Sequence, residues 1–209
     1  MNLTLGLHQT RQQQPERVVT WFGDRQRTYG EMADRVARIA GVLRECGVET
    51  GDRVAMLATN SDRYLEYYLA TWWAGAIASP VNTRWSAPEI IYSLNDSGTC
   101  VLLVDQAFAH LVPALQAQAH TLKHVLFFDD GAAPGDLPDL ERWLRQVDPT
   151  EDMGRQRDDP AVIFYTGGTT GVPKGVVLSH FNLWSSAMSR MAMIHSSPDA
   201  VGLHVAPLF

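Results

Sequence analysis

Four short apolar segments, separated from one another by helical patterns, constrain the fold of this chain more than any other feature. They cover residues 53–58, 77–81, 100–104 and 124–128. Strands that are buried on both faces appear as continuous apolar runs, and parallel sheets are covered by helices on both faces. The sequence therefore predicts an α/β fold, in which mostly parallel β-sheets are flanked by helices.

Two capping boxes mark the starts of helices between these strands. Thr28 is followed three residues later by Glu31, and Ser86 is followed by Glu89 with a proline in the first turn. In such a pair each side chain accepts a hydrogen bond from a free backbone N–H at the start of the helix. Further helices are expected at residues 61–73, 107–119, 140–147 and 182–194, and further strands at 18–22, 26–28, 160–165, 175–178 and 202–206.

The polar segment 148–159 is the best candidate for a linker inside the fold. We therefore expect residues 1–147 to form a first α/β region. Residues 160–209 then begin the region that carries the most informative motif, and the whole of 1–209 forms one incomplete N-terminal domain.

Composition excludes some classes of protein. Hydrophobic residues make up 45% of the chain and charged residues 19%, as in globular proteins. The net charge of −6 disfavours nucleic acid as a partner, because a phosphate backbone requires a basic surface. Cys46 and Cys100 belong to no C-x-x-C motif and are expected to be buried apolar side chains in a reducing compartment.

No segment of the sequence resembles a membrane anchor or a leader peptide. The most apolar stretch, residues 67–81, is about 15 residues long, whereas a membrane-spanning helix needs ~20. Residues 1–17 are polar and lack the apolar core of a signal peptide. The sequence predicts a cytoplasmic protein without a transmembrane segment.

The segment from Tyr165 to Gly175 carries the chemistry. Its sequence, YTGGTTGVPKG, holds four glycines, three threonines and one lysine between two apolar strands. Glycines allow backbone N–H groups to approach an anion closely, hydroxyls add neutral donors, and lysine adds positive charge. Together these groups suit a polyphosphate.

The segment is not a Walker A loop. That motif requires Gly-Lys-Ser/Thr followed by a helix, whereas here Pro173 precedes Lys174 and an apolar strand follows. The alternative to phosphate binding is a glycine- and threonine-rich hairpin loop that binds no ligand.

The segment resembles the phosphate-binding loop of the adenylate-forming superfamily, which includes acyl-CoA synthetases, firefly-type luciferases and the adenylation domains of peptide synthetases. The usual form is Tyr-Thr-Ser-Gly-Thr/Ser-Thr-Gly-x-Pro-Lys-Gly. The chain departs from it at Gly167, where serine is more common, so that one hydroxyl donor is replaced by backbone donors. The resemblance extends over most of the chain, through Thr28–Met32, Gly47–Leu57, Trp73–Arg84 and Val205–Phe209.

This resemblance implies the N-terminal part of the large domain of an acyl-CoA synthetase-like fold, with ATP, Mg²⁺ and CoA as cofactors and a carboxylic acid as substrate. In the family a carboxylate attacks the α-phosphate of ATP, and the thiol of CoA then displaces AMP. The loop holds the phosphates that leave as pyrophosphate. The resemblance assigns phosphate binding to Thr166, Gly167, Gly168, Thr169, Thr170, Gly171 and Lys174.

Three further residues are weaker candidates. Arg84 lies where some CoA ligases of the family use arginine against the nucleotide phosphate of CoA, and the alternative is a surface arginine that follows a strand. His180 resembles the histidine of the family's Thr/Ser-His-x-Asn segment, but packing or capping is the favoured role. His204 is expected to be structural, because no carboxylate or cysteine lies at metal-ligand spacing.

The sequence thus predicts part of an acyl-CoA synthetase for a fatty or aromatic acid. The family's magnesium-binding glutamate and C-terminal lysine lie beyond Phe209, so the chain is expected to be inactive alone. An acyl–carrier-protein ligase, a luciferase-like enzyme and a non-catalytic nucleotide-binding or interaction module are alternatives. We also expect a homo-oligomer, because unpaired strand edges and exposed apolar surface favour self-association.

Overall fold

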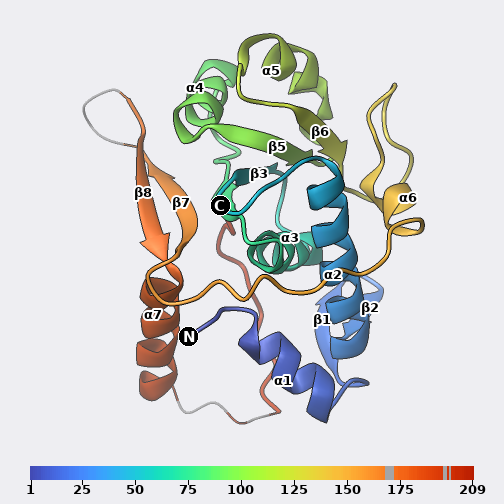
Figure 1. Ribbon diagram of the computed structural model, residues 1–209, viewed down its shortest axis with the longest axis vertical. Coiled ribbons are helices and arrows are strands. Elements are labelled where there is room, and N and C mark those ends of the chain that lie inside the picture. Colours follow the sequence, from blue (N-terminus) through green and yellow to red (C-terminus); the bar gives the residue numbers. More distant parts are fainter. Residues whose placement is uncertain (168–171, 195–196, 198) are drawn as a thin grey trace.

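The computed structural model describes residues 1–167, 172–194, 197 and 199–209. A six-stranded sheet forms its centre, in the order β6-β5-β3-β4-β7-β8 (Figure 1). All neighbouring strands are parallel except β7 and β8, which form an antiparallel hairpin. The predicted mostly parallel sheet is confirmed. The strands are β3 (Arg53–Leu57), β4 (Ile77–Pro80), β5 (Thr99–Val104), β6 (His124–Phe127), β7 (Pro160–Thr166) and β8 (Lys174–Ser179).

Both faces of the parallel part of the sheet are buried. Helices α2 (Tyr29–Glu45) and α3 (Asp62–Trp73) cover one face, and α4 (Ala87–Ser97) and α5 (Val112–Gln118) cover the other (Figure 1). Alternate residues of β3 divide accordingly, because Val54 and Met56 join the cluster under α2 while Ala55 and Leu57 join the cluster under α4. This division is the reason why the strands appear as continuous apolar runs.

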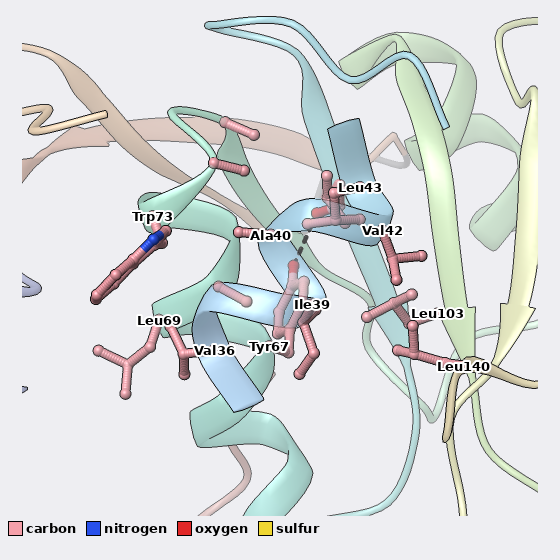
Figure 2. Close-up of a cluster of buried hydrophobic side chains, with 14 of the residues drawn as sticks. Val36, Ile39, Ala40, Val42, Leu43, Tyr67, Leu69, Trp73, Leu103 and Leu140 are labelled. Carbon is pink, nitrogen blue, oxygen red and sulfur yellow. Dashed lines mark hydrogen bonds between the residues drawn. The ribbon is translucent and has the colours of Figure 1, made fainter. Parts of the chain in front are cut away.

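The larger cluster is built where α2 crosses α3. Val36, Ile39 and Leu43 of α2 pack beside Tyr67 and Trp73 of α3, as Figure 2 shows. The buried hydroxyl of Tyr67 donates a 2.8 Å hydrogen bond to the carbonyl of Val54 and accepts one from the N–H of Ser79. One side chain therefore fixes α3 against both β3 and β4.

The predicted helix starts are confirmed in detail. The backbone N–H of Thr28 donates to Oε2 of Glu31 at 2.8 Å, and that of Ser86 donates to Oε2 of Glu89 at 2.8 Å. A third capping box joins Ser179 to Asn182 at the start of α7 (His180–Met193). Each cap contributes about 1 kcal/mol of helix stability.

A buried ion-pair network joins α2 to α3 and α6 (Leu140–Leu144). The guanidinium of Arg35 donates to both oxygens of the fully buried Glu66 and to both oxygens of Glu141, at 2.7–3.0 Å. Burial alone would raise the pKa of Glu141, but the hydrogen bond and charge of Arg35 outweigh it, so this pKa is lowered. The same partners raise the pKa of Arg35 against the opposing effect of burial. Arg35 and Glu141 therefore stay ionised together.

The predicted strand at 202–206 is wrong. Residues 201–205 form no strand, and Val201, Leu203 and Val205 are largely exposed, because no neighbouring strand among the described residues accepts their backbone groups. The following residues are held by side chains instead. Asn60 donates from Nδ2 to the carbonyl of Ala206 at 2.6 Å and accepts from the N–H of Leu208 at 3.0 Å.

Helix α1 (Leu5–Gln13) lies in a segment where the sequence pattern predicts no helix. It buries Leu7 alone, so its sequence has no helical apolar stripe. Two side chains attach its start to the rest of the protein. Thr4 donates from Oγ1 to Asp152, and Nε2 of His8 lies 2.8 Å from the same carboxylate. Strands β1 (Val18–Phe22) and β2 (Arg25–Thr28) form as expected. The helix expected at 107–119 is divided into a 3-10 turn (Ala109–Leu111) and α5.

Residues 148–156 have no regular secondary structure and run along α2 and α3. The N–H of Thr150 donates to the carbonyl of Ala37, and Nε1 of Trp73 donates to the carbonyl of Thr150 at 2.8 Å. Beyond this segment the β7–β8 hairpin joins the parallel strands through one register pair, Ala78 with Val162. The division of the chain at 148–159 stays a prediction.

Candidate functional site

The residues singled out by the sequence meet at one edge of the central sheet. Asn82 and Arg84 follow the end of β4, and Tyr165 and Thr166 end β7. Because β4 and β7 are parallel neighbours, their carboxyl ends lie at the same edge. Open α/β sheets bind their ligands at this edge.

The glycine- and threonine-rich segment forms the tip of the β7–β8 hairpin. Thr166 pairs with Lys174 in the last register position, and the side chains of both are exposed. Gly167 is also exposed, and no atom of the described residues lies within 4 Å of the position that a Cβ would occupy. Gly168, Thr169, Thr170 and Gly171 lie outside the described residues. The assignment of phosphate binding to this segment stays a prediction.

Gly175 has a packing role that the glycine-rich motif alone does not reveal. It is the register partner of Tyr165. A Cβ at this position would lie 2.9 Å from Cγ2 of Ile163 and 3.1 Å from Cζ of Tyr165. Cross-strand aromatic–glycine pairs of this kind fix strand register. Glycine is therefore required here by the tyrosine ring.

Tyr165 anchors the first arm of the hairpin to helix α4. Its hydroxyl donates a 2.6 Å hydrogen bond to Oδ2 of Asp96, and its ring meets the Trp85 ring edge-on at a centroid distance of 6.1 Å. Burial raises the pKa of Tyr165, and the neighbouring Asp96 carboxylate raises it further. The phenol therefore stays protonated and acts as a donor. No sequence pattern pointed to Asp96.

A cavity of about 330 Å³ lies beside this anchor. It combines one guanidinium, one amide and aromatic rings, and its lining residues are Pro80, Asn82, Arg84, Phe164, Tyr165, Pro207 and Phe209. The N–H of Arg84 donates to Oδ1 of Asn82 at 3.0 Å, which turns the chain after β4. The hydroxyl of Tyr68 donates to the carbonyl of Leu208 and holds the segment that supplies Pro207 and Phe209.

The chemistry of this edge suits an anionic ligand that carries a planar group. Arg84 and Lys174 supply positive charge, Thr166 supplies a hydroxyl, and Tyr165 with Phe209 supplies flat apolar surface. Within the described part of the chain, no group of three or more His, Cys, Asp or Glu side chains is placed to hold a metal ion.

His180 begins α7 directly after β8 and is not among the residues that line this cavity, which agrees with its expected packing role. The residue is 1% exposed, and its ring meets that of Trp72 edge-on at 6.2 Å. Neither ring nitrogen has a hydrogen-bond partner among the residues that the structure describes. Burial lowers the pKa of His180 to about 4, so the ring is neutral at physiological pH.

Comparison with known proteins agrees with this geometry. The family model described as AMP-binding enzyme matches residues 7–209. A feruloyl-CoA synthase of Amycolatopsis sp is 37% identical over 195 residues, which cover 93% of this chain and 37% of the relative. A long-chain-fatty-acid–CoA ligase of Thermus thermophilus is 40% identical over 184 residues, covering 87% of this chain and 34% of the relative.

A solved structure of a fatty acyl CoA synthetase of Mycobacterium tuberculosis superposes with a TM-score of 0.81 at 31% identity. The match covers 93% of this chain and 38% of that structure. The chain thus spans about a third of the length of the curated relatives it matches. None of the helices that the structure describes is long and apolar enough to cross a membrane.

The family model covers almost the whole chain, and the solved structure shares its fold. The chain belongs to the AMP-binding enzyme family, and it corresponds to part of the length of the CoA ligases that it matches.

Proposed function

We propose that this chain supplies the ATP-binding edge of a ligase that converts a carboxylic acid into an acyl-adenylate and then into a CoA thioester. The observation that carries the proposal is the shared sheet edge, at which the β7–β8 hairpin presents Thr166 and Lys174 beside the cavity lined by Arg84. Family membership supports the reaction class.

In the first half-reaction a carboxylate oxygen attacks the α-phosphorus of ATP, and the bond to the bridging oxygen of pyrophosphate breaks. Charge then develops on the leaving β- and γ-phosphates. We assign their stabilisation to Thr166, Gly167, Gly168, Thr169, Thr170, Gly171 and Lys174, as preorganised donors. Mg²⁺, when bound, would add charge neutralisation at the same phosphates.

In the second half-reaction the thiol sulfur attacks the acyl carbon, AMP leaves with the electron pair of the broken C–O bond, and the thiol proton is released. We assign Arg84 to a phosphate of the CoA nucleotide, because its guanidinium lines the cavity beside flat apolar rings. The acid stays open between the fatty and aromatic classes, since relatives are named for both.

The thiol acceptor is the second open point. A fatty acid–[acyl-carrier-protein] ligase of Streptomyces coeruleorubidus is 34% identical over 153 residues, or 73% of this chain and 28% of the relative. A carrier-protein thiol is therefore the second candidate acceptor. The two free cysteines are buried, which fits the cytoplasmic, reducing location that we propose.

The two lysines of the chain provide a matched test of nucleotide binding. Titration calorimetry with Mg-ATP and with AMP compares Lys174→Ala with Lys123→Ala, since Lys123 is exposed before β6. We expect Lys174→Ala to weaken ATP binding about tenfold, as for loss of a charge-assisted hydrogen bond, and to leave AMP binding unchanged. Lys123→Ala should change neither. Equal loss for both nucleotides, or no ATP binding by the unaltered chain, would overturn the phosphate assignment.

Catalytic turnover by the chain alone requires a test separate from nucleotide binding. Because the chain spans about a third of its relatives, we expect a pyrophosphate-release assay with carboxylic acids, ATP and Mg²⁺ to remain at background for the chain alone. Robust release by the pure chain would show that it contains a complete adenylation site.

A further inference from the structure

One wall of the candidate cavity comes from a segment without secondary structure of its own. Pro207 and Phe209 supply this wall. Residues 199–209 belong to no helix or strand, and those at 201–207 are exposed. Holding such a segment in one conformation costs conformational entropy at every residue. Other parts of the protein must therefore keep the wall in place.

Two side chains from the region of β3 and α3 hold this segment. Asn60, between β3 and α3, donates from Nδ2 to the carbonyl of Ala206 at 2.6 Å and accepts from the N–H of Leu208 at 3.0 Å. The hydroxyl of Tyr68 on α3 donates to the carbonyl of Leu208. Over the described ranges of the chain, these are the hydrogen bonds that residues 201–209 make.

The amide of Asn60 is suited to this position because one neutral group both donates and accepts. Its two partners, Ala206 and Leu208, are the residues on either side of Pro207, which has no N–H of its own. The two bonds therefore hold Pro207 from both sides. Phe209 directly follows the second tied residue, so its position depends on the same bonds.

Asn60 is in turn held by the central strands. Asp105, which follows β5 and is 5% exposed, accepts hydrogen bonds from the backbone N–H and from Oγ1 of Thr59, both at 2.8 Å. Strands β3 and β5 are parallel neighbours. A continuous series of contacts thus runs from the buried centre of the sheet to the cavity wall. Sites are precise when a second layer of contacts of this kind supports them.

We propose that Asn60 is a positioning residue of the candidate site, which acts through Pro207 and Phe209 to shape the cavity for the planar part of its ligand. The wall supplies apolar surface, and Arg84 supplies charge. Without the amide the wall must be ordered when the ligand binds, and affinity falls because binding then includes this entropic cost. The inference rests on the proposed function for the identity of the ligand, which is CoA.

A second asparagine of the chain provides a matched control. Asn95 on α4 donates from Nδ2 to the carbonyl of Gln118 at 3.0 Å and accepts from the N–H of His120 at 2.7 Å. It therefore ties two residues with the same spacing, and both asparagines are half-buried. Asn95 and its partners are not among the residues that line the cavity. Asn95→Ala thus removes the same pair of bonds without changing the wall.

Titration calorimetry with CoA compares the unaltered chain, Asn60→Ala and Asn95→Ala. We expect Asn60→Ala to weaken CoA binding about tenfold, as for the loss of one or two hydrogen bonds, and Asn95→Ala to leave it unchanged. The urea midpoints of the two variants should fall equally, so that a merely structural role would not separate them. Amide hydrogen exchange of Leu208, followed by NMR, should become at least about tenfold faster in Asn60→Ala.

The outcomes separate this inference from the proposed function. Circular dichroism checks the fold of Asn60→Ala, and Asn60→Asp, which has the same shape but cannot donate to Ala206, replaces it if it does not fold. Equal CoA affinities of the Asn60 and Asn95 variants, or unchanged exchange of the Leu208 amide, would overturn the positioning role. Absence of CoA binding by the unaltered chain would overturn the CoA assignment instead, and exchange of Leu208 then decides by itself whether Asn60 holds the wall.

Discussion

The hydroxyl of Tyr165 lies 2.6 Å from Oδ2 of Asp96, and this contact joins the arm of the glycine-rich hairpin to helix α4. The β7–β8 hairpin shares one register pair with the parallel strands, between Ala78 and Val162. The contact therefore contributes to the direction in which the hairpin leaves the sheet, and with it to the position of Thr166.

We expect Tyr165→Phe and Asp96→Asn each to lower the free energy of unfolding by about 0.5–1.5 kcal/mol, because each weakens the same charge-assisted hydrogen bond. The double variant should cost less than the sum of the two single variants. Urea unfolding of the four proteins measures this coupling. Strictly additive losses would show that the two side chains do not interact in solution.

Gly175→Ala should destabilise the protein by about 1–3 kcal/mol, since its Cβ would lie 2.9 Å from Ile163 and crowd the Tyr165 ring. Gly167→Ser provides the control. A side chain at that position meets no atom within 4 Å, so the free energy of unfolding should change by less than about 0.5 kcal/mol. Thermal unfolding of both variants tests the comparison, and equal effects would contradict the packing role of Gly175.

Arg35→Ala should cost about 3–5 kcal/mol of stability, because it leaves the fully buried carboxylate of Glu66 without its principal partner. Arg11→Ala, at an exposed position of α1, should change stability by less than about 0.5 kcal/mol. Denaturant unfolding distinguishes the two. A small effect of Arg35→Ala would mean that Arg27, whose Nε lies 3.6 Å from Glu66, compensates for the loss.

Arg84→Ala should weaken CoA binding about tenfold and leave ATP binding unchanged, if the guanidinium contacts a phosphate of CoA as proposed. Arg142→Ala, on the exposed side of α6, is the matched control. Parallel titrations with CoA and Mg-ATP provide the measurement. In a ligase that contains this segment, the same variant should raise the KM for CoA without slowing formation of the acyl-adenylate. Loss of ATP binding would instead identify Arg84 as structural.

Acid should destabilise the chain partly through His180. Its pKa is about 4 in the folded state against 6.5 ordinarily, so the unfolded chain binds the additional proton. The stability is complete above pH 6.5 and is lost as pH falls toward 4. We expect this residue alone to account for about 1–3 kcal/mol between those values. His180→Leu should flatten the slope of stability against pH in this window, measured by denaturant unfolding. An unchanged slope would contradict neutral burial.

The strands and helices of the first region could be predicted because their signals are local. Continuous apolar runs and capping boxes depend on neighbouring residues, and both appear where expected. The strand expected at 202–206 had an apolar pattern but no strand to pair with, and pairing is not encoded in a short segment. Helix α1 could not be predicted, because it has no apolar pattern of its own. Contacts with Asp152, more than 140 residues away, hold it in place.

The candidate site also contains some residues that the sequence predicted and others that it did not. The glycine-rich motif predicted the loop between β7 and β8, and the family resemblance predicted Arg84. The partners that place them, Asp96 and the side chains that hold residues 206–208, carry no pattern of their own. Gly175 was attributed to the loop as a whole, whereas its close approach to Tyr165 becomes visible only when the two strands are paired.

The single register pair between Ala78 and Val162 has a consequence for the order in which the protein opens. Strands β3, β4 and β5 share many ladder positions and two buried clusters, so they form the most cooperative unit. The β7–β8 hairpin shares fewer ladder positions with them, and Nε1 of Trp72 on α3 holds it by a 2.8 Å hydrogen bond to the carbonyl of Ala161. The hairpin that we propose to bind the nucleotide should therefore be the first part of the sheet to open, and nucleotide binding there should slow the earliest step of unfolding.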